Sequence, residues 1–230
     1  MDEYKIIQDK FNNTIFKIEF PNYSKSILKS IQNQLIGSTI SNNYQSITFN
    51  ALNVKTLNEY KNENNISYDI ILKMIFSLSK QLDYLINNES KIFLIYNSKN
   101  IIVIDNKFIY LSNNYLINLN IENKTIQIIS PFCKEEEFIS PELLKIKRIP
   151  SIINYKIIYY SLGCLAIHTL TNINKNKIKK KKEKEKEEEK QEEKEKHIDL
   201  ILTSINNTKL FYLLKRCVHK NFKKRTILYF

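Results

Sequence analysis

Apolar residues between positions 152 and 170 are distributed around every side of a helix. The stretch reads IINYKIIYYSLGCLAIHTL, and at helical spacing its Ile, Leu and Ala residues form no single stripe. A helix that is apolar all round is normally buried within a core. We therefore predict that residues 152–170 form a central core helix.

A membrane span is the alternative interpretation of this run, because about 20 apolar residues are enough to cross a bilayer. No second run of similar purity occurs in the sequence. Four polar residues also interrupt the run, namely Asn154, Lys156, Ser161 and His168. We therefore expect no membrane partner.

Two other segments have apolar residues at spacings of three and four, which is typical of amphipathic helices. The first covers residues 23–36, with Gly37 in position to act as its C-cap. The second runs from residue 70 to 86, after a Ser67 cap, and ends at Asn87-Asn88. Shorter helices are expected at residues 55–62, 198–205 and 210–218.

Strands are predicted where short β-branched or aromatic runs are separated by Asn. Residues 4–20 predict a hairpin around Asn12-Asn13, and residues 44–52 predict a single strand. Residues 91–129 contain several such runs and predict a series of hairpins, one of which turns at Asp105-Asn106. Separate helices and antiparallel strands together give an α+β fold class.

Glycine is scarce, since the chain contains only Gly37 and Gly163. Loops that hold phosphates through backbone N–H groups need several glycines at fixed spacing. The sequence therefore excludes a P-loop and a dinucleotide-binding motif.

The formal net charge is +12 at pH 7. Most lysines are scattered among Ile and Asn, without the arginine and aromatic interleaving of nucleic-acid-binding surfaces. We therefore expect no nucleic-acid partner. Residues 174–196 are almost entirely Asn, Lys and Glu, and without an apolar stripe they are expected to be a solvated low-complexity insert.

Three cysteines, Cys133, Cys164 and Cys217, are far apart in the sequence and form no C-x-x-C pair. The first residues, MDEYKIIQDK, are too charged for the apolar part of a signal peptide. This pattern predicts reduced thiols in an intracellular protein, for which we expect the cytoplasm, and it predicts no metal site.

The order of these elements resembles the C-terminal lobe of eukaryotic-type protein kinases. QLDYLI is similar to the end of the helix before the family's catalytic loop, and ISPEL at 139–143 resembles the motif that closes its activation segment. YYSLGCLAIHTLT resembles the family's central helix, and the segment 213–230 is similar to its C-terminal segment. The resemblance implies a protein-kinase-like α+β fold with a mainly helical C-lobe and a reduced N-terminal β/α lobe.

The resemblance also implies structural roles for four residues. Glu142 and Arg225 match a carboxylate and a guanidinium that pair across the family's C-lobe, and a bidentate pair of this type is geometrically specific. Ser161 and Gly163 match the central helix. Ile158 stands where the family has an Asp that hydrogen-bonds the catalytic-loop backbone.

The catalytic positions do not match the family. Asn100 aligns with the metal-binding Asn of the catalytic loop, which places Ile95 at the catalytic base. An isoleucine cannot accept a proton from a substrate hydroxyl. Asn113 falls at the Mg²⁺-binding Asp, and a neutral amide is a poorer ligand than a carboxylate. The resemblance therefore implies an inactive domain without bound metal.

The N-terminal side is short. Residues 1–52 are too few for the family's usual five strands and a helix, so we expect a reduced N-lobe-like region there and a C-lobe-like domain over 53–230. Lys17 is a candidate for the phosphate-contacting Lys, but residues 23–36 contain no Glu to pair with it. An ordinary strand lysine is the favoured interpretation, and Lys17 and Asn100 are at most vestigial ATP-binding residues that act without Mg²⁺.

We therefore expect a catalytically inactive protein-kinase-like domain that acts as a protein-interaction or scaffold module with a protein partner. A divergent active serine/threonine protein kinase is one alternative, and it would place a carboxylate near Asn100. A non-kinase helical binding protein is the other, and it would lack the arrangement of hinge, loop and central helix.

Overall fold

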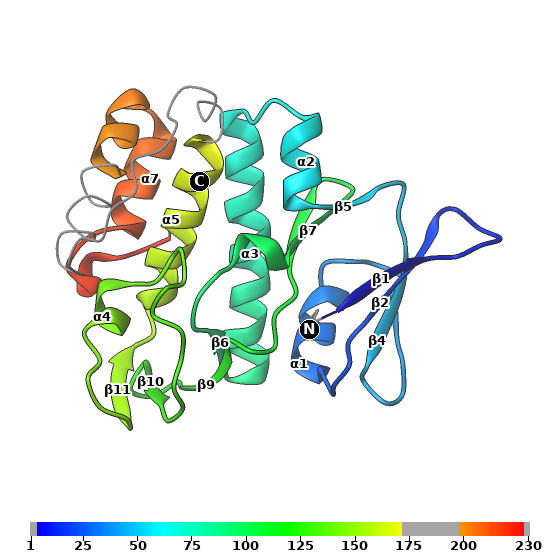
Figure 1. The fold of residues 1–230 in the computed structure, drawn as a ribbon, viewed down its shortest axis with the longest axis horizontal. Coiled ribbons are helices and arrows are strands. Elements are labelled where there is room, and N and C mark those ends of the chain that lie inside the picture. Colours follow the sequence, from blue (N-terminus) through cyan, green and yellow to red (C-terminus); the bar gives the residue numbers. More distant parts are fainter. Residues whose placement is uncertain (1–3, 172–197, 228–230) are drawn as a thin grey trace.

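The computed structural model describes residues 4–171 and 198–227 (Figure 1). In these ranges the chain has an α+β fold, in which helices pack with three small antiparallel sheets. The Lys/Glu tract predicted to be a solvated insert, residues 174–196, lies outside the described residues.

The N-terminal sheet has the strand order β1-β2-β4-β3. Its strands are β1 (Lys5–Gln8), β2 (Ile15–Glu19), β3 (Thr39–Ile40) and β4 (Ser46–Asn50). The hairpin predicted for residues 4–20 and the strand predicted within residues 44–52 are confirmed. On β2, Phe16 and Ile18 are buried while the residues between and after them are partly exposed, as expected for a sheet with one covered face.

Helix α1 (Lys25–Gln32) contacts β3, β4 and the long helix α3 (Tyr68–Glu89). It ends at Gln32 with Asn33 as C-cap, so the prediction that Gly37 caps this helix is wrong. Gly37 has a φ of 79° and lies in the turn before β3. The left-handed conformation that favours glycine is therefore needed in this turn and not at the helix end.

Helix α3 has the predicted N-cap, Ser67. The Ser67 hydroxyl accepts a hydrogen bond from the Ile70 N–H. The helix ends at Glu89, one residue after the predicted Asn87-Asn88, and Ser90, with a left-handed backbone, is its C-cap. Its apolar residues at spacings of three and four are buried, namely Ile71, Met74, Ile75, Leu78, Leu82 and Leu85. This is the amphipathic pattern expected from the sequence.

The remaining strands form two sheets, ordered β5-β7-β8 and β11-β10-β9-β6. The first contains β5 (Val54–Thr56), β7 (Ile101–Ile104) and β8 (Lys107–Tyr110), and the second contains β6 (Lys91–Phe93), β9 (Leu116–Asn120), β10 (Thr125–Ile128) and β11 (Ser151–Asn154). The turn at Asp105-Asn106 joins β7 to β8 as predicted.

Helix α2 (Leu57–Glu63) follows β5. Hydrogen bonds from Thr56 lower the pKa of the Glu59 carboxyl at the N-terminus of this helix.

The central helix is α5 (Ile157–Thr171), and it is buried on all sides as predicted. It begins later than expected, because residues 151–154 are recruited as β11 and pair with β10. No helix in the two described ranges is both long and apolar enough to cross a membrane.

The C-terminal part packs on α5. Residues 198–204 are helical, and α7 (Lys209–Cys217) contacts α5 directly. A Cβ at Gly163 would lie 2.8 Å from both Cys217 Cβ and Val218 Cγ1. The absence of a side chain at Gly163 therefore sets how closely α5 and α7 approach.

The N-terminal sheet is attached to the rest of the protein through α1 (Figure 1). The Ser26 hydroxyl donates to Glu89 of α3 at 2.9 Å, and Lys29 forms an ion pair with the same carboxylate at 3.5 Å. Lys107 Nζ donates to the Gln34 carbonyl at 2.9 Å. These contacts fix α1 and the turn that follows it against the larger, mainly helical part.

Candidate functional site

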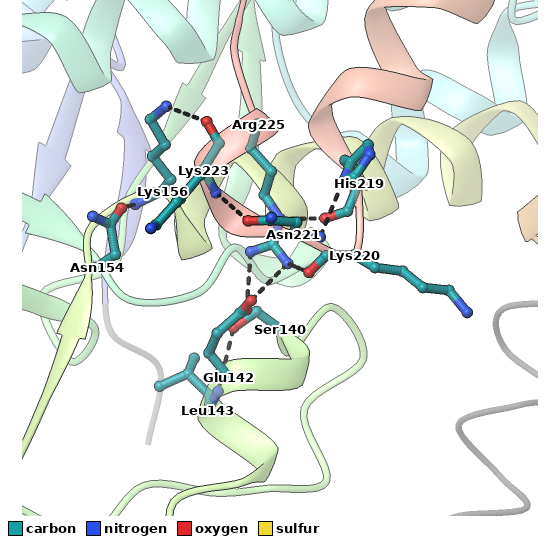
Figure 2. Close-up of polar contacts among 10 residues, drawn as sticks. All are labelled: Ser140, Glu142, Leu143, Asn154, Lys156, His219, Lys220, Asn221, Lys223 and Arg225. Atoms are coloured by element: carbon teal, nitrogen blue, oxygen red, sulfur yellow. Dashed lines mark hydrogen bonds and ion pairs between the residues drawn. The ribbon is translucent and has the colours of Figure 1, made fainter.

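The side chains of Glu142 and Arg225 contact each other where the segment after α7 lies against α4, residues Pro141–Leu144 (Figure 2). Arg225 Nη1 donates to Glu142 Oε2 at 2.9 Å, and Nη2 donates to Oε1 at 2.8 Å. The pair expected from the sequence is therefore present, and it is bidentate. The Arg225 side chain is fully buried, whereas Glu142 is 20% exposed.

Local structure fixes both members of this pair. Glu142 lies in the first turn of α4 (Pro141–Leu144), whose N-cap hydroxyl, Ser140 Oγ, accepts from the Leu143 N–H. Arg225 follows the short helix η3 (Phe222–Lys224). Its Nε donates to the His219 carbonyl at 2.7 Å, its Nη2 also donates to the Lys220 carbonyl at 3.3 Å, and its guanidinium lies 5.0 Å from the Tyr160 ring centroid. The charge of the buried guanidinium is therefore balanced by the Glu142 carboxylate, and its hydrogen bonds hold it in one orientation.

Ser161 has a role that the sequence did not reveal. Its hydroxyl accepts a hydrogen bond of 2.8 Å from the Tyr96 N–H, which joins α5 to the loop after β6. Ile158, for which the resemblance implied the position of an Asp, is fully buried and has no side-chain acceptor. Ser161 lies about one helical turn after Ile158, on the same face of α5. This spacing was the one feature of the sequence that could have indicated the contact of Ser161 with the loop.

Ile95 is fully buried in the same loop. Its carbonyl accepts a hydrogen bond of 3.0 Å from the Tyr110 hydroxyl. Around it, Tyr110 contacts Phe93 and Tyr96 with ring centroids 4.8 and 4.9 Å apart. All three rings are buried, so the position that the resemblance assigns to a catalytic base is part of an aromatic core.

Asn100 and Asn113 make structural contacts. Asn100 ends the short helix η1 (Ser98–Asn100), and its carbonyl accepts from the Leu111 N–H at 2.8 Å. Asn113 Nδ2 donates to the hydroxyl of Ser24, the residue before α1. The Asn113 amide thus connects the segment after β8 with the N-terminal region.

Glu136 is an acidic residue that is hydrogen-bonded to the loop before Asn100. The sequence did not predict this contact. Asn97 Nδ2 donates to Glu136 Oε2 at 3.0 Å, and the Tyr115 hydroxyl donates to Oε1. Neither contact has a local sequence signal, because Glu136 is 39 residues from Asn97. Within the described ranges, no group of three or more His, Cys, Asp or Glu side chains is arranged to hold a metal ion.

Lys17 contacts its own strand. Its ammonium lies 2.5 Å from a carboxylate oxygen of Glu19, and both side chains are about 40% exposed. Because Phe16 and Ile18 occupy the covered face of β2, Lys17 and Glu19 project from the other face. The structure therefore pairs Lys17 with Glu19 and not with α1.

Two cavities lie in the larger part of the molecule. One of about 300 Å³ adjoins β9 and β10 and is lined by residues including Leu94, Tyr115, Ile128 and Phe132. The second, of about 190 Å³, lies between residues 199–206 and α7. Neither of these two cavities is lined by residues 1–52.

Comparisons with known proteins leave the family open: no model of a known protein family matches the chain, and no curated protein matches its sequence.

Proposed function

We propose that this protein is a protein-kinase-like domain that does not transfer phosphate and acts as an interaction or scaffold module for a protein partner. The observation that carries the proposal is the bidentate pair of buried Arg225 with Glu142, at the two positions that the resemblance singled out. A bidentate pair requires a defined distance and orientation of its two groups, and here the fold brings residues 83 positions apart into that geometry.

The order of elements supports the same proposal. A small antiparallel sheet with one helix precedes a long helix, a loop, hairpins, the short α4, a buried central helix and α7. The N-terminal sheet has four strands where the family has five, in keeping with a reduced N-lobe-like region over residues 1–52.

The surroundings of Ile95 and Asn113 support the absence of phosphotransfer. Kinase chemistry relies on Mg²⁺ and a carboxylate that orients the attacking hydroxyl. Ile95 is buried among aromatic rings, and the Asn113 amide is hydrogen-bonded to Ser24. Both positions have packing or hydrogen-bonding partners, which favours a structural role over a catalytic one. Any ATP binding is expected to be independent of Mg²⁺.

A phosphotransfer assay tests this proposal. Purified protein, incubated with labelled ATP, Mg²⁺ and a general acceptor protein, is expected to incorporate no more label than a heat-denatured sample. Ile95→Asp is expected to leave the result unchanged, because catalytic parts act as a unit and one restored group does not suffice.

The divergent-kinase alternative predicts the opposite result. It would need a carboxylate near the loop, and Glu136, bonded to Asn97, is the available candidate. Mg²⁺-dependent labelling that Glu136→Gln abolishes would overturn our proposal. Glu135→Gln, which changes the neighbouring carboxylate, is the matched control. A thermal-shift titration with ATP, with and without Mg²⁺, measures nucleotide binding separately.

A further inference from the structure

The C-terminal segment carries a large share of the positive charge of the molecule. After Asp199 the sequence contains seven Lys or Arg residues and no Asp or Glu, against a formal net charge of +12 for the whole chain. Five of these cations are exposed within ten residues and define what we call the basic patch: Lys215, Arg216, Lys220, Lys223 and Lys224.

The basic patch is held in a fixed shape by the contacts of Arg225. The carbonyls of His219 and Lys220 accept hydrogen bonds from the Arg225 guanidinium, which folds the segment back on itself. Lys156, in the turn between β11 and α5, brings a further positive charge to this segment. Its Nζ donates to the Lys223 carbonyl at 3.2 Å. Figure 2 shows the Lys220 side chain extending away from Arg225. The charges are therefore displayed by an ordered segment.

Glu142 does not neutralise this surface, because its carboxylate is already bonded to Arg225. Within the described ranges, four cations of the patch form no ion pair with a carboxylate: Lys215, Arg216, Lys223 and Lys224. A concentrated field of one sign attracts ligands of the opposite charge.

A cavity of about 190 Å³ adjoins the patch at Lys215. Its walls include Leu202 and Phe211, together with Asp199, and Tyr212 on the neighbouring face of α7 is half-exposed. An apolar side chain fits such a cavity, and Asp199 can accept hydrogen bonds from the N–H groups of a peptide. Phosphate groups offer no such donors, and a bilayer surface cannot enter a cavity of this size.

We propose that the basic patch and this cavity together bind an acidic segment of a partner protein that carries one apolar anchoring side chain. The composition of the patch agrees, since lysine outnumbers arginine there, whereas arginine is the better bidentate ligand for nucleic-acid phosphates. This inference rests on the non-catalytic binding function proposed above and names the class of partner.

Fluorescence anisotropy with labelled peptides tests the proposal. The probes are a 12-residue Glu-rich peptide with one central Leu and the same peptide with Ser in place of that Leu. The Leu peptide is expected to bind more tightly, and its affinity should fall as salt rises from about 50 to 300 mM, because screening weakens exposed charges. Equal affinities would overturn the anchoring role of the cavity.

Charge reversal locates the site. The variant Lys215→Glu, Lys220→Glu, Lys223→Glu and Lys224→Glu is expected to weaken binding at least about tenfold, since four attractive charges become repulsive toward an acidic peptide. The matched control reverses four other exposed lysines, Lys5, Lys10, Lys73 and Lys80, and gives the same net charge. An equal loss in both variants would overturn the proposal, and circular dichroism verifies that both are folded.

Competing ligands complete the test. Tighter binding of a 20-base-pair DNA, a single-stranded RNA or vesicles containing phosphatidylserine would overturn the choice of a protein partner. Phosphotransfer is measured independently, so failure of peptide binding does not alter the result of the labelling assay, and labelling does not alter the result of the peptide titration.

Discussion

At the scale of single residues, the charge pair at the C-terminal side is the most informative feature. Removing one member of a buried pair leaves the other charge without a partner, which costs about 3–5 kcal/mol. We therefore expect Glu142→Ala to lower the free energy of unfolding by about this amount in urea denaturation, because Arg225 is fully buried. The double variant Glu142→Leu, Arg225→Met should lose less than the sum of the two single losses. Additive losses would show that the two groups do not interact.

The Ser161 hydroxyl is a second site where one atom has a large effect. Ser161→Ala would leave the buried Tyr96 N–H without its acceptor, and we expect a loss of about 1–3 kcal/mol in the free energy of unfolding. Ser204→Ala, at an exposed serine that bonds only to a carbonyl of its own helix, is the matched control and should change little. Hydrogen exchange at the Tyr96 amide provides a direct measurement, and unchanged protection would contradict the prediction.

The buried thiol of Cys217 should make the free energy of unfolding depend on pH. Burial raises the pKa of this thiol to about 12 from a usual value of 9.0. Below pH 9 the thiol is protonated in both states, whereas between pH 9 and 12 only the unfolded chain releases the proton. This group therefore lowers the free energy of unfolding by up to about 1.4 kcal/mol per pH unit over that window. Urea denaturation of Cys217→Ala should lose this component of the pH dependence, and an identical dependence in both proteins would contradict the assignment.

At the scale of elements, the contact between α5 and α7 depends on one glycine. Alanine normally favours a helix over glycine by about 1 kcal/mol. A Cβ at Gly163, however, would lie 2.8 Å from Cys217 Cβ and Val218 Cγ1. We expect Gly163→Ala to destabilise the protein by about 1–3 kcal/mol through overpacking, and Val218→Ala to restore part of the loss. A rise in melting temperature for Gly163→Ala would mean that the helices separate at little cost.

Elements with a local signal could be predicted from the sequence, and those that depend on distant partners could not. The Ser67 cap and the three-and-four spacing of α3 are both local, as is the turn at Asp105-Asn106. By contrast, residues 151–154 overlap the start of the apolar run at 152–170 and form β11 only because β10 offers its edge.

The candidate site follows the same division. Glu142 and Arg225 could be paired in advance because each lies in a motif that resembles a known one. The bonds of Ser161 to Tyr96 and of Glu136 to Asn97 join common polar residues 65 and 39 positions apart, without any spacing rule. Such pairs are determined by tertiary packing, which the local pattern does not specify.

At the scale of the whole molecule, the tract at residues 174–196 is predicted to be dispensable. Replacing residues 173–197 with a short Gly/Ser linker should shift the melting temperature by only about 3 °C or less, because loop-closure costs change slowly with length. Removal of α7, which packs on α5, is the destabilising control. Insoluble protein after deletion of the tract alone would show that it contributes to folding.

The separation of Glu142 from Arg225 also affects how the protein is made. The two residues are 83 positions apart, and ribosomes add roughly 5–20 residues per second, so the carboxylate is synthesised about 4–17 s before its partner. By the end of this interval the nascent chain contains α4 and the central helix, but not the segment that lies against them. Released chains that end before Arg225 should consequently be more accessible to proteases than the full chain.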